Sequence, residues 1–505
     1  MLMRYNNKIM LFLCSFVLFA LVVTGISLQE RKYCMGVPVI SEERLEEYTE
    51  IDSLDISQLI FEGQPIAVDW PRKQVYVSQS SNALKKFFDL QGKISSENPE
   101  YELFMLNTPT LKDIRASVKS GESFTLIIKN GTSYQKVPMI ITTMPILFLK
   151  LEGTGEDEQG RSIMRGMLTL WNSGNPKTET YQTTTSYVEW RMRGNSTRTF
   201  PKLAWKVNLR DEIGQKNDED FLGLGSDDDW ILNPMSMDDT FVKEKLVQTL
   251  WSQLVSKTDY NYKMSNGEYV ELFINGAYQG IYLLQRRIDA KYLELNKERD
   301  VLLKGINTWE AESIQDAYEI VSTPLDYEES YEILKQTMTF EDGNITNASN
   351  FIDVSLLLQF ISGIDNYGYK NTFYVLKDKN GSYELYFVPW DTDLSLGVTW
   401  GYDYEESMNE VIERYELPVM KSEIDVLDAK FVKRWKELRQ GIYSEENVLR
   451  VYKELTEQLS SSGAIERDEE KWGLLHEGED NWENLRRFIK ERLRFLDEYY
   501  LKLEN

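Results

Sequence analysis

The spacing of apolar residues changes along this chain, and that change limits the folds it can adopt. Short runs that alternate apolar and polar residues fill the first half, and Asn-Gly pairs at 130–131 and 275–276 separate two pairs of them. Runs joined in this way indicate β-hairpins. Residues 241–255 instead carry apolar side chains at helical spacing, and 466–503 form a charged helical pattern. The sequence therefore predicts an α+β protein whose β-rich first part precedes a mostly helical end.

The 505 residues divide into three predicted parts. Arg4 and Lys8 stand before an uncharged apolar run within residues 1–29. About nineteen such residues, at about 1.5 Å each, cover a hydrocarbon core of about 30 Å. We therefore predict a signal anchor or signal peptide, which would make the protein single-pass with its main domain outside the cell membrane, or secreted after cleavage. Residues 30–143 are predicted to form a small β-rich accessory domain, and residues 144–505 the main domain.

Composition narrows the possible chemistry. The chain has a formal net charge of −25, one histidine and two cysteines, Cys14 and Cys34. So acidic a protein repels a polyphosphate backbone, and nucleic acid is therefore not an expected partner. One histidine cannot supply a His-rich zinc site, and two cysteines near the N-terminus cannot build a metal site in the main domain. Catalysis is left to carboxylate, amide, cationic and hydroxyl groups, which suit a hard cation such as Mg²⁺.

The first concentration of functional side chains surrounds a Gly-Asn-Ser-Thr turn between two predicted strands. Its candidate ligand-binding residues are Arg193, Asn195, Ser196, Arg198, Lys202 and Lys206. Backbone N–H groups, hydroxyls and cations gathered in an acidic chain suit an anion such as nucleotide phosphate. We prefer Lys206 for the lysine that contacts the α- and β-phosphates, with Lys304 as a second candidate. A surface turn with incidental charges remains the alternative.

Two acidic motifs flank one predicted strand hairpin. Asp365 precedes Asn371 at the end of a predicted helix, and Asp391 and Asp393 follow the predicted strand 383–388. An Asp followed by an Asn is the arrangement with which a kinase orients the acceptor hydroxyl and holds a metal. On an extended backbone Asp391 and Asp393 would face one side, where a cation would relieve their repulsion. Each motif alone is ambiguous, since D-x-D also serves glycosyltransferases, but together they predict one metal-dependent site.

Several motifs of this chain, taken in their order along the sequence, resemble those of the CotH (spore coat protein H) kinase family. The likeness rests on Arg193-Gly-Asn-Ser-Thr-Arg198, Asp229-Trp-Ile-Leu232, the hairpin 270–284, the segment 365–371, Pro389-Trp-Asp-Thr-Asp393 and the final helix 481–497. The resemblance implies an atypical protein-kinase-like fold that transfers the γ-phosphoryl of ATP, with Mg²⁺ or Mn²⁺, to Ser or Thr of surface or coat proteins. It also implies that Asp365 is the catalytic-loop aspartate, Asn371 its partner and Asp391 a metal ligand. We add Asp393 and Asn371 to the predicted metal ligands.

The chain departs from the family's usual pattern at two places. Gln285 and Arg286 stand where the family usually has Thr-Glu, and Lys243 and Glu244 where it usually has Arg-Asn. The first departure reverses a charge beside the expected nucleotide cleft. The sequence is therefore compatible with three functions. They are an active kinase, a degenerate kinase fold that serves as a surface scaffold or cell-wall-polymer binder, and another metal-dependent transferase or hydrolase that acts on a sugar.

Overall fold

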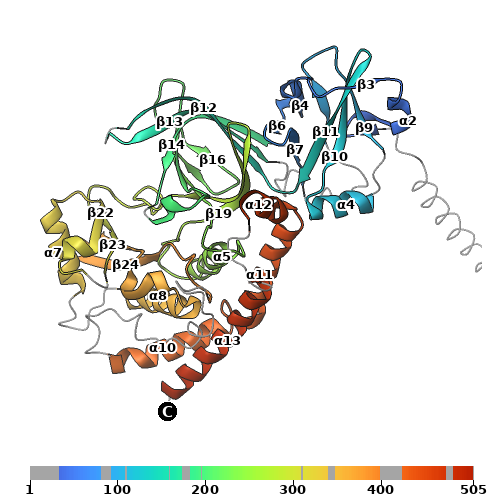
Figure 1. Cartoon of the computed structure of the whole chain (residues 1–505). Helices are drawn as coiled ribbons and strands as arrows, with labels where there is room; N and C mark the ends of the chain where they lie inside the picture. The colour runs from blue at the N-terminus through green and yellow to red at the C-terminus, as the bar shows by residue number, and fades with distance from the viewer. Residues whose placement is uncertain are drawn as a thin grey trace, which may run out of the picture. The chain divides into compact units, whose positions relative to one another are not determined.

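The computed structural model describes residues 33–80, 92–107, 111–157, 160–172, 182–194, 196–308, 311–338, 347–397, 424–473 and 481–503. Helices and strands both contribute substantially (Figure 1), so the predicted α+β class is confirmed. The described residues fall into two compact units. The first runs to Thr143 and also includes Gln182, and the second comprises Met144–Asn172 and the residues from Thr183 on.

The N-terminal unit consists mostly of short strands. Its elements are β1 (Tyr33–Cys34), β2 (Val37–Ile40), α2 (Glu42–Leu45), β3 (Thr49–Glu50), η1 (Ile56–Gln58), β4 (Leu59–Phe61), β5 (Gln64–Pro65), β6 (Ala67–Asp69), β7 (Gln74–Ser78), β8 (Ile94–Ser96), β9 (Glu102–Leu106), α4 (Leu111–Ser120), β10 (Phe124–Asn130) and β11 (Ser133–Thr142). The larger sheet runs β1-β2-β9-β10-β11-β7-β6, with β3 beside β11, and β5-β4-β8 form a smaller one. Asn130 pairs with Ser133 across the β10–β11 turn, which confirms the first predicted hairpin.

The second unit begins with a closed barrel (Figure 1). Its strands are β12 (Ile146–Glu156), β13 (Ser162–Asn172), β14 (Gln182–Met192), β15 (Trp205–Arg210), β18 (Asp229–Asn233), β19 (Gly267–Ile274) and β20 (Ala277–Arg286). The order is β12-β13-β14-β15-β18-β20-β19, and a parallel pairing of β12 with β19 closes it. Asn275 and Gly276 both have positive φ, 53° and 71°, in the β19–β20 turn. Asn-Gly favours this kind of hairpin turn, and the second predicted hairpin is confirmed.

A four-stranded sheet and several helices complete the second unit. The sheet order is β22-β21-β23-β24, and one apolar core joins it to α5, α8 and the C-terminal helices. The elements are η2 (Ser196–Thr199), β16 (Glu219–Asp220), β17 (Ser226–Asp227), α5 (Lys243–Val255), β21 (Val301–Gly305), α6 (Ile314–Ala317), β22 (Tyr318–Ser322), α7 (Tyr327–Met338), α8 (Ala348–Ile361), η3 (Ile364–Tyr369), β23 (Thr372–Asp378), β24 (Tyr383–Pro389), α10 (Ile424–Arg439), α11 (Glu445–Ser460), α12 (Ala464–Trp472) and α13 (Asn481–Leu503). The pattern predicted one helical segment over 466–503, but α12 ends before Gly473, whose φ of 74° is not helical.

Two buried ion pairs fasten α12 to the barrel. The ammonium of Lys202 lies 2.6 Å from Oδ2 of Asp468, and the same oxygen accepts the N–H of Ile281 at 2.7 Å. The guanidinium of Arg467 donates two hydrogen bonds of 2.9 Å to the carboxylate of Glu271. The segment after the Gly-Asn-Ser-Thr turn is therefore held by a helix near the end of the chain.

Gly166 on β13 is packed against the backbone of β12. A Cβ at this position would lie 1.9 Å from the carbonyl oxygen of Lys150, beside the β-bulge between Leu151 and Gly153. We expect Gly166→Ala to lower the free energy of unfolding by about 2–4 kcal/mol, because two backbones must separate. Gly153→Ala is the matched control, since its Cβ would meet nothing within 4 Å. Urea denaturation checks the difference, and equal stability of the two variants would contradict it.

The predicted single-pass membrane localisation has to be corrected. No helix in the described ranges is long and apolar enough to cross a membrane. The predicted anchor, residues 1–29, lies outside those ranges.

Candidate functional site

Asp365 lies in η3, between the end of α8 and the start of β23. Two consecutive residues hold the two oxygens of its carboxylate. The ammonium of Lys370 lies 2.7 Å from Oδ1, and the side-chain amide of Asn371 donates to Oδ2 at 2.8 Å. The structure thus brings the predicted pair Asp365 and Asn371 into direct contact, and it adds Lys370, which the sequence analysis did not single out.

Asp391 and Asp393 follow β24 directly. The sequence analysis assumed an extended backbone here, but Asp391 has a φ of 58°, so the segment turns instead. The two carboxylates interact nevertheless. Burial raises the pKa of Asp393 well above its usual range, and the charge of Asp391 raises it further. The repulsion between Asp391 and Asp393 that the sequence indicated is therefore present, although the backbone turns at Asp391 instead of running extended.

Hydrogen bonds tie the segment of Asp365 to the segment of Asp391. The N–H of Ile364 donates to the carbonyl of Leu394 at 3.2 Å, and the side-chain amide of Asn366 donates to the carbonyl of Trp390 at 3.0 Å. Lys304 on β21 interacts electrostatically with both aspartates. Burial lowers its pKa, whereas Asp391 and Asp365 act to raise it. The two acidic motifs therefore share one neighbourhood with a partly buried cation.

Arg193 lies beside Asp391 at the end of β14. Its guanidinium is 5.8 Å from the ring centroid of Trp390, which precedes Asp391 in the chain. Burial lowers the pKa of Arg193, and the charge of Asp391 opposes that shift. Arg193 and Lys304 are thus two partly desolvated cations that face the same carboxylate.

Lys206 belongs to a second group of cations, on the barrel. Its ammonium lies 2.9 Å from Oδ2 of Asp229, and the guanidinium of Arg287 lies 3.1 Å from the same oxygen. Burial lowers the pKa of Lys206, and Asp229 opposes that shift. Because Arg287 and Asp229 also interact electrostatically with Arg193, the cations extend from the barrel toward Asp391. Oxygens of a polyphosphate are the anions that such an arrangement suits.

The remaining predicted phosphate-binding residues lie elsewhere or outside the described part of the chain. Lys202 is 1% exposed, and its ammonium pairs with Asp468, so we leave it out of the candidate site. Ser196 opens η2, and Arg198 in the same turn is exposed. Asn195 lies outside the described ranges.

Glu244 is a residue that the sequence analysis noticed only as a departure from the family's pattern. It is buried in the first turn of α5, where its Oε2 accepts the N–H and the hydroxyl of Thr392 at 2.9 and 2.8 Å. Its Oε1 accepts the side-chain amide of Gln248 at 3.1 Å. Burial, followed by the charge of Asp391, raises the pKa of Glu244 to about 7. A divalent cation would relieve the repulsion among Glu244, Asp391 and Asp393, and all three offer the oxygen ligands that Mg²⁺ and Mn²⁺ prefer.

The raised pKa of Glu244 predicts how the stability of the metal-free protein changes with pH. The folded value is about 7 and the ordinary value 4.5, so the folded state holds a proton that the unfolded state releases. The resulting stability is fully present below the ordinary pKa and is lost as the pH rises through the folded value. We expect the free energy of unfolding to fall by up to about 3 kcal/mol between about pH 5 and pH 8.

Urea unfolding in EDTA across this pH range checks that expectation, with Glu244→Gln as the control that cannot ionise. The variant should show a smaller loss of stability over the same range. An identical pH dependence in both proteins would contradict the assignment of the effect to Glu244. Mn²⁺ should restore stability most at the alkaline end, where the carboxylates are charged.

Gln285 and Arg286, the first departure from the family's pattern, lie at the end of β20. The charge of Arg286 is paired, and the side chain of Gln285 is buried. The guanidinium of Arg286 lies 2.6 Å from Oδ2 of Asp227, so its charge is paired. Gln285 is buried, and its side-chain carbonyl accepts the amide of Gln248 at 2.8 Å, the same amide that contacts Glu244. The positive charge that Arg286 introduces is therefore compensated by the carboxylate of Asp227.

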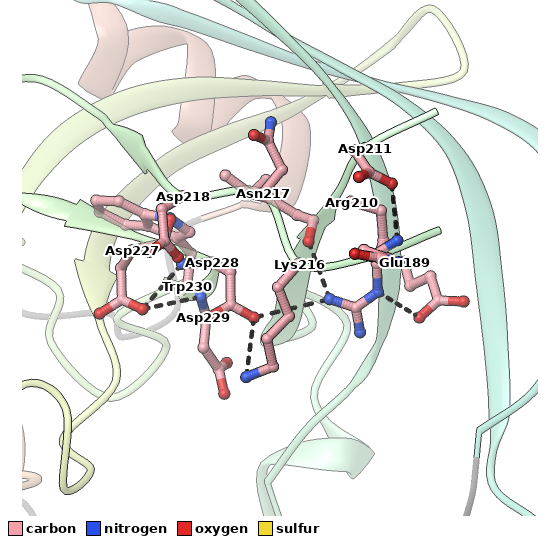
Figure 2. Close-up of polar contacts among 12 residues, drawn as sticks. Glu189, Arg210, Asp211, Lys216, Asn217, Asp218, Asp227, Asp228, Asp229 and Trp230 are labelled. Carbon is pink, nitrogen blue, oxygen red and sulfur yellow. Dashed lines mark hydrogen bonds and ion pairs between the residues drawn. The ribbon is translucent and has the colours of Figure 1, made fainter. Parts of the chain in front are cut away.

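A second group of carboxylates lies near β16 and β17 (Figure 2). One oxygen from each of Asp218, Asp227 and Asp228 falls within 4.8 Å of the others, which is close enough for a metal ion. Lys291 approaches all three, at 2.6, 3.2 and 3.7 Å. Arg210 and Lys216 point toward Asp228 at 3.7 and 3.4 Å. These cations already balance the group. Its signal in the sequence is the pair of consecutive aspartates just before β18, Asp227 and Asp228, to which the fold adds Asp218.

The comparisons with known proteins agree with the motifs. The model of the CotH kinase protein family matches residues 190–496. No curated protein matches the chain. The matched segment contains the residues brought together above, namely Arg193, Lys206, Glu244, Lys304, Asp365, Lys370, Asn371, Asp391 and Asp393. Because the match covers most of the sequence, the chain belongs to the CotH kinase family.

Proposed function

We propose that this protein transfers the γ-phosphoryl group of ATP to a Ser or Thr hydroxyl of a protein, with Mg²⁺ or Mn²⁺. Family membership supports a kinase-like enzyme at a coarse level. The observation that carries the finer proposal is the pair of hydrogen bonds between the Asp365 and Asp391 segments, with Lys304 interacting with both aspartates. Phosphoryl transfer needs a carboxylate at the acceptor, a metal-binding carboxylate and nearby cations, and it needs no histidine.

The acidic side chains divide into two roles. Asp391 and Asp393 would hold the divalent ion, with Glu244 close behind Thr392. The ion would neutralise charge on the β- and γ-phosphates. Arg193 and Lys304 face Asp391 and would bind phosphate oxygens beside it.

Asp365 would receive the proton of the acceptor hydroxyl. The hydroxyl oxygen forms a bond to the γ-phosphorus while the bond from that phosphorus to the β,γ-bridging oxygen breaks, and ADP leaves with the electron pair. Asn371 holds one oxygen of Asp365 through a hydrogen bond of 2.8 Å, which fixes the direction of the other. Positioning of this kind supplies a large part of the rate in phosphoryl transfer.

The scaffold alternative drew on the predicted export signal, because ATP is scarce outside the cell, and on Gln285 and Arg286 near the expected cleft. Because Asp227 pairs with the charge of Arg286 at 2.6 Å, the argument from that charge against nucleotide binding loses its force. An active enzyme is therefore the function that the side chains support best.

Transfer of label from γ-labelled ATP tests the proposal. The full-length protein is incubated with Mn²⁺ or Mg²⁺ and a protein substrate rich in Ser and Thr, and autophosphorylation is followed in parallel. We expect label on Ser or Thr, and we expect EDTA to prevent its incorporation. Absence of ATP binding at millimolar nucleotide with the metal present would contradict the proposal, and turnover of a nucleotide-sugar would favour the sugar transferase instead.

A further inference from the structure

We propose that Lys370 is a catalytic residue whose ammonium leaves Asp365 and contacts the transferring phosphoryl group. The inference rests on the proposed function and deepens it, since it names the cation at the acceptor end of the site. Its starting point is the ion pair of 2.7 Å between Lys370 and Oδ1 of Asp365.

In the free protein both oxygens of Asp365 are engaged. Lys370 contacts Oδ1, and the amide of Asn371 contacts Oδ2. An acceptor hydroxyl that gives its proton to Asp365 must approach one of these oxygens, and although each oxygen can accept a second hydrogen bond, a group already bound there competes for the same site. Asn371 is 7% exposed, and its side-chain amide also donates to the backbone carbonyl of Asp365 at 3.4 Å. The ammonium of Lys370 ends a flexible side chain that is 35% exposed, so Lys370 is the partner that can move away.

The backbone just before Lys370 is held in an unfavourable conformation. Tyr369 has a φ of 60°, in the left-handed region that a bulky residue seldom adopts, whereas Asn371 has a φ of 52°, which asparagine tolerates. The hydroxyl of Tyr374 donates to the carbonyl of Tyr369 at 3.2 Å, and the N–H of Asn371 donates to the carbonyl of Gly305 at 2.9 Å. Strained residues of this kind persist where the surroundings fix them, and they cluster at functional sites.

With this backbone conformation, the consecutive residues Lys370 and Asn371 contact opposite oxygens of the Asp365 carboxylate. An ion pair as exposed as that of Lys370 and Asp365 contributes little to folding stability. A role in folding alone therefore does not account for a conformation that costs free energy to maintain.

The charge distribution of the site gives Lys370 a separate task. Arg193 interacts electrostatically with Asp391, at the end where the metal and the leaving group would lie, and Lys304 interacts with both Asp391 and Asp365. Lys370 contacts Asp365, at the end where the acceptor would lie. During transfer, negative charge is spread over the oxygens of the phosphoryl group between these ends, and cations at both ends would stabilise it.

In the step itself, the acceptor oxygen bonds to the γ-phosphorus as the bond to the bridging oxygen of ADP breaks. The hydroxyl proton passes to the oxygen of Asp365 that Lys370 has left. The ammonium keeps its proton throughout and moves from one anion, the carboxylate, to another, the phosphoryl group.

Steady-state kinetics of full-length Lys370→Ala and Lys370→Arg test the inference, with ATP, Mn²⁺ and a protein acceptor. We expect Lys370→Ala to lower kcat by about 10²–10³-fold and to change the KM for ATP by less than about 3-fold. Lys370→Arg should recover at least about tenfold of that loss, because it restores a mobile cation. Lys379→Ala is the matched control. Lys379 pairs with Glu384 at 3.1 Å on the neighbouring hairpin, and kcat should stay within about 3-fold.

The outcomes separate this inference from the function on which it rests. If the wild type transfers label and Lys370→Ala keeps its kcat within about 3-fold, the inference is overturned and the function stands. A rise in the KM for ATP with unchanged kcat would also overturn it, because it would assign Lys370 to nucleotide binding. No transfer by the wild type would overturn the function and the inference with it. Thermal melting of each variant shows whether the substitution has unfolded the protein. A variant that is inactive because it is unfolded would not be rescued by arginine.

Discussion

Asp391→Ala lowers the kcat of phosphoryl transfer by at least about 10³-fold in our account. Asp391 is the carboxylate with which the partly buried cations Arg193 and Lys304 both interact, and its charge raises the pKa values of Glu244 and Asp393. Its removal would delete the proposed metal ligand and weaken the charge balance of these two cations. Both effects act where the phosphates would lie, so weaker binding of Mn²⁺ should accompany the loss of rate.

The matched control for this variant is Asp228→Asn in the second group of carboxylates. Asp228 is buried and paired with cations, but it belongs to the barrel end rather than to the Asp391 segment. We expect its kcat and its affinity for Mn²⁺ to stay within about 3-fold of the wild type. Initial rates with labelled ATP and titration with Mn²⁺ give both quantities. Loss of Mn²⁺ binding in Asp228→Asn and not in Asp391→Ala would reverse our assignment of the metal site.

Asp468→Ala should have the largest effect on stability, a loss of about 3–5 kcal/mol. The substitution leaves the ammonium of Lys202 buried without its carboxylate, and it removes the acceptor of the Ile281 N–H. Burial already lowers the pKa of Lys202, and Asp468 opposes that shift. A buried cation that has lost its partner is costly, whereas an apolar pair of similar volume is often tolerated.

The double variant Lys202→Met with Asp468→Leu therefore recovers much of the stability lost in Asp468→Ala. Urea unfolding of the wild type and the two variants measures this recovery. The double variant should also retain phosphoryl transfer, because we assign Lys202 to the packing of α12 rather than to the nucleotide. A single variant that loses less than about 1 kcal/mol, or a double variant that folds but has no activity, would contradict this reading of the ion pair.

Much of the fold follows from local signals in the sequence. The Asn-Gly pairs at 130–131 and 275–276 both mark hairpins, although in different ways. Asn275 and Gly276 form the turn itself, both with positive φ, whereas Asn130 is the last residue of β10 and only Gly131 has positive φ. The helical spacing over 241–255 corresponds to α5, Lys243–Val255. Closure of the barrel was not predicted, because it depends on the parallel pairing of β12 with β19, which are far apart in the chain.

The parts of the candidate site that could be predicted are those whose residues lie close together in the sequence. Asp365 and Asn371 are close in sequence, and Asp365 in η3 contacts Asn371 two residues after that turn ends. Lys206 was preferred over Lys202 as the phosphate-contacting lysine, but the burial of Lys202 was not foreseen, because it depends on Asp468 in α12, which no local pattern reveals. Glu244 was not assigned for a similar reason, since its contact with Thr392 joins α5 to a segment far along the chain.

The central claim is that Asp365 and the Asp391 segment bind one metal–nucleotide complex between them. A crystal structure with Mn²⁺ and a non-hydrolysable ATP analogue tests it most directly. We predict an anomalous peak about 2.0–2.3 Å from a carboxylate oxygen of Asp391, with the γ-phosphate between that ion and Asp365. Mn²⁺ seated instead on Asp218, Asp227 and Asp228, or a γ-phosphate remote from Asp365, would contradict the account.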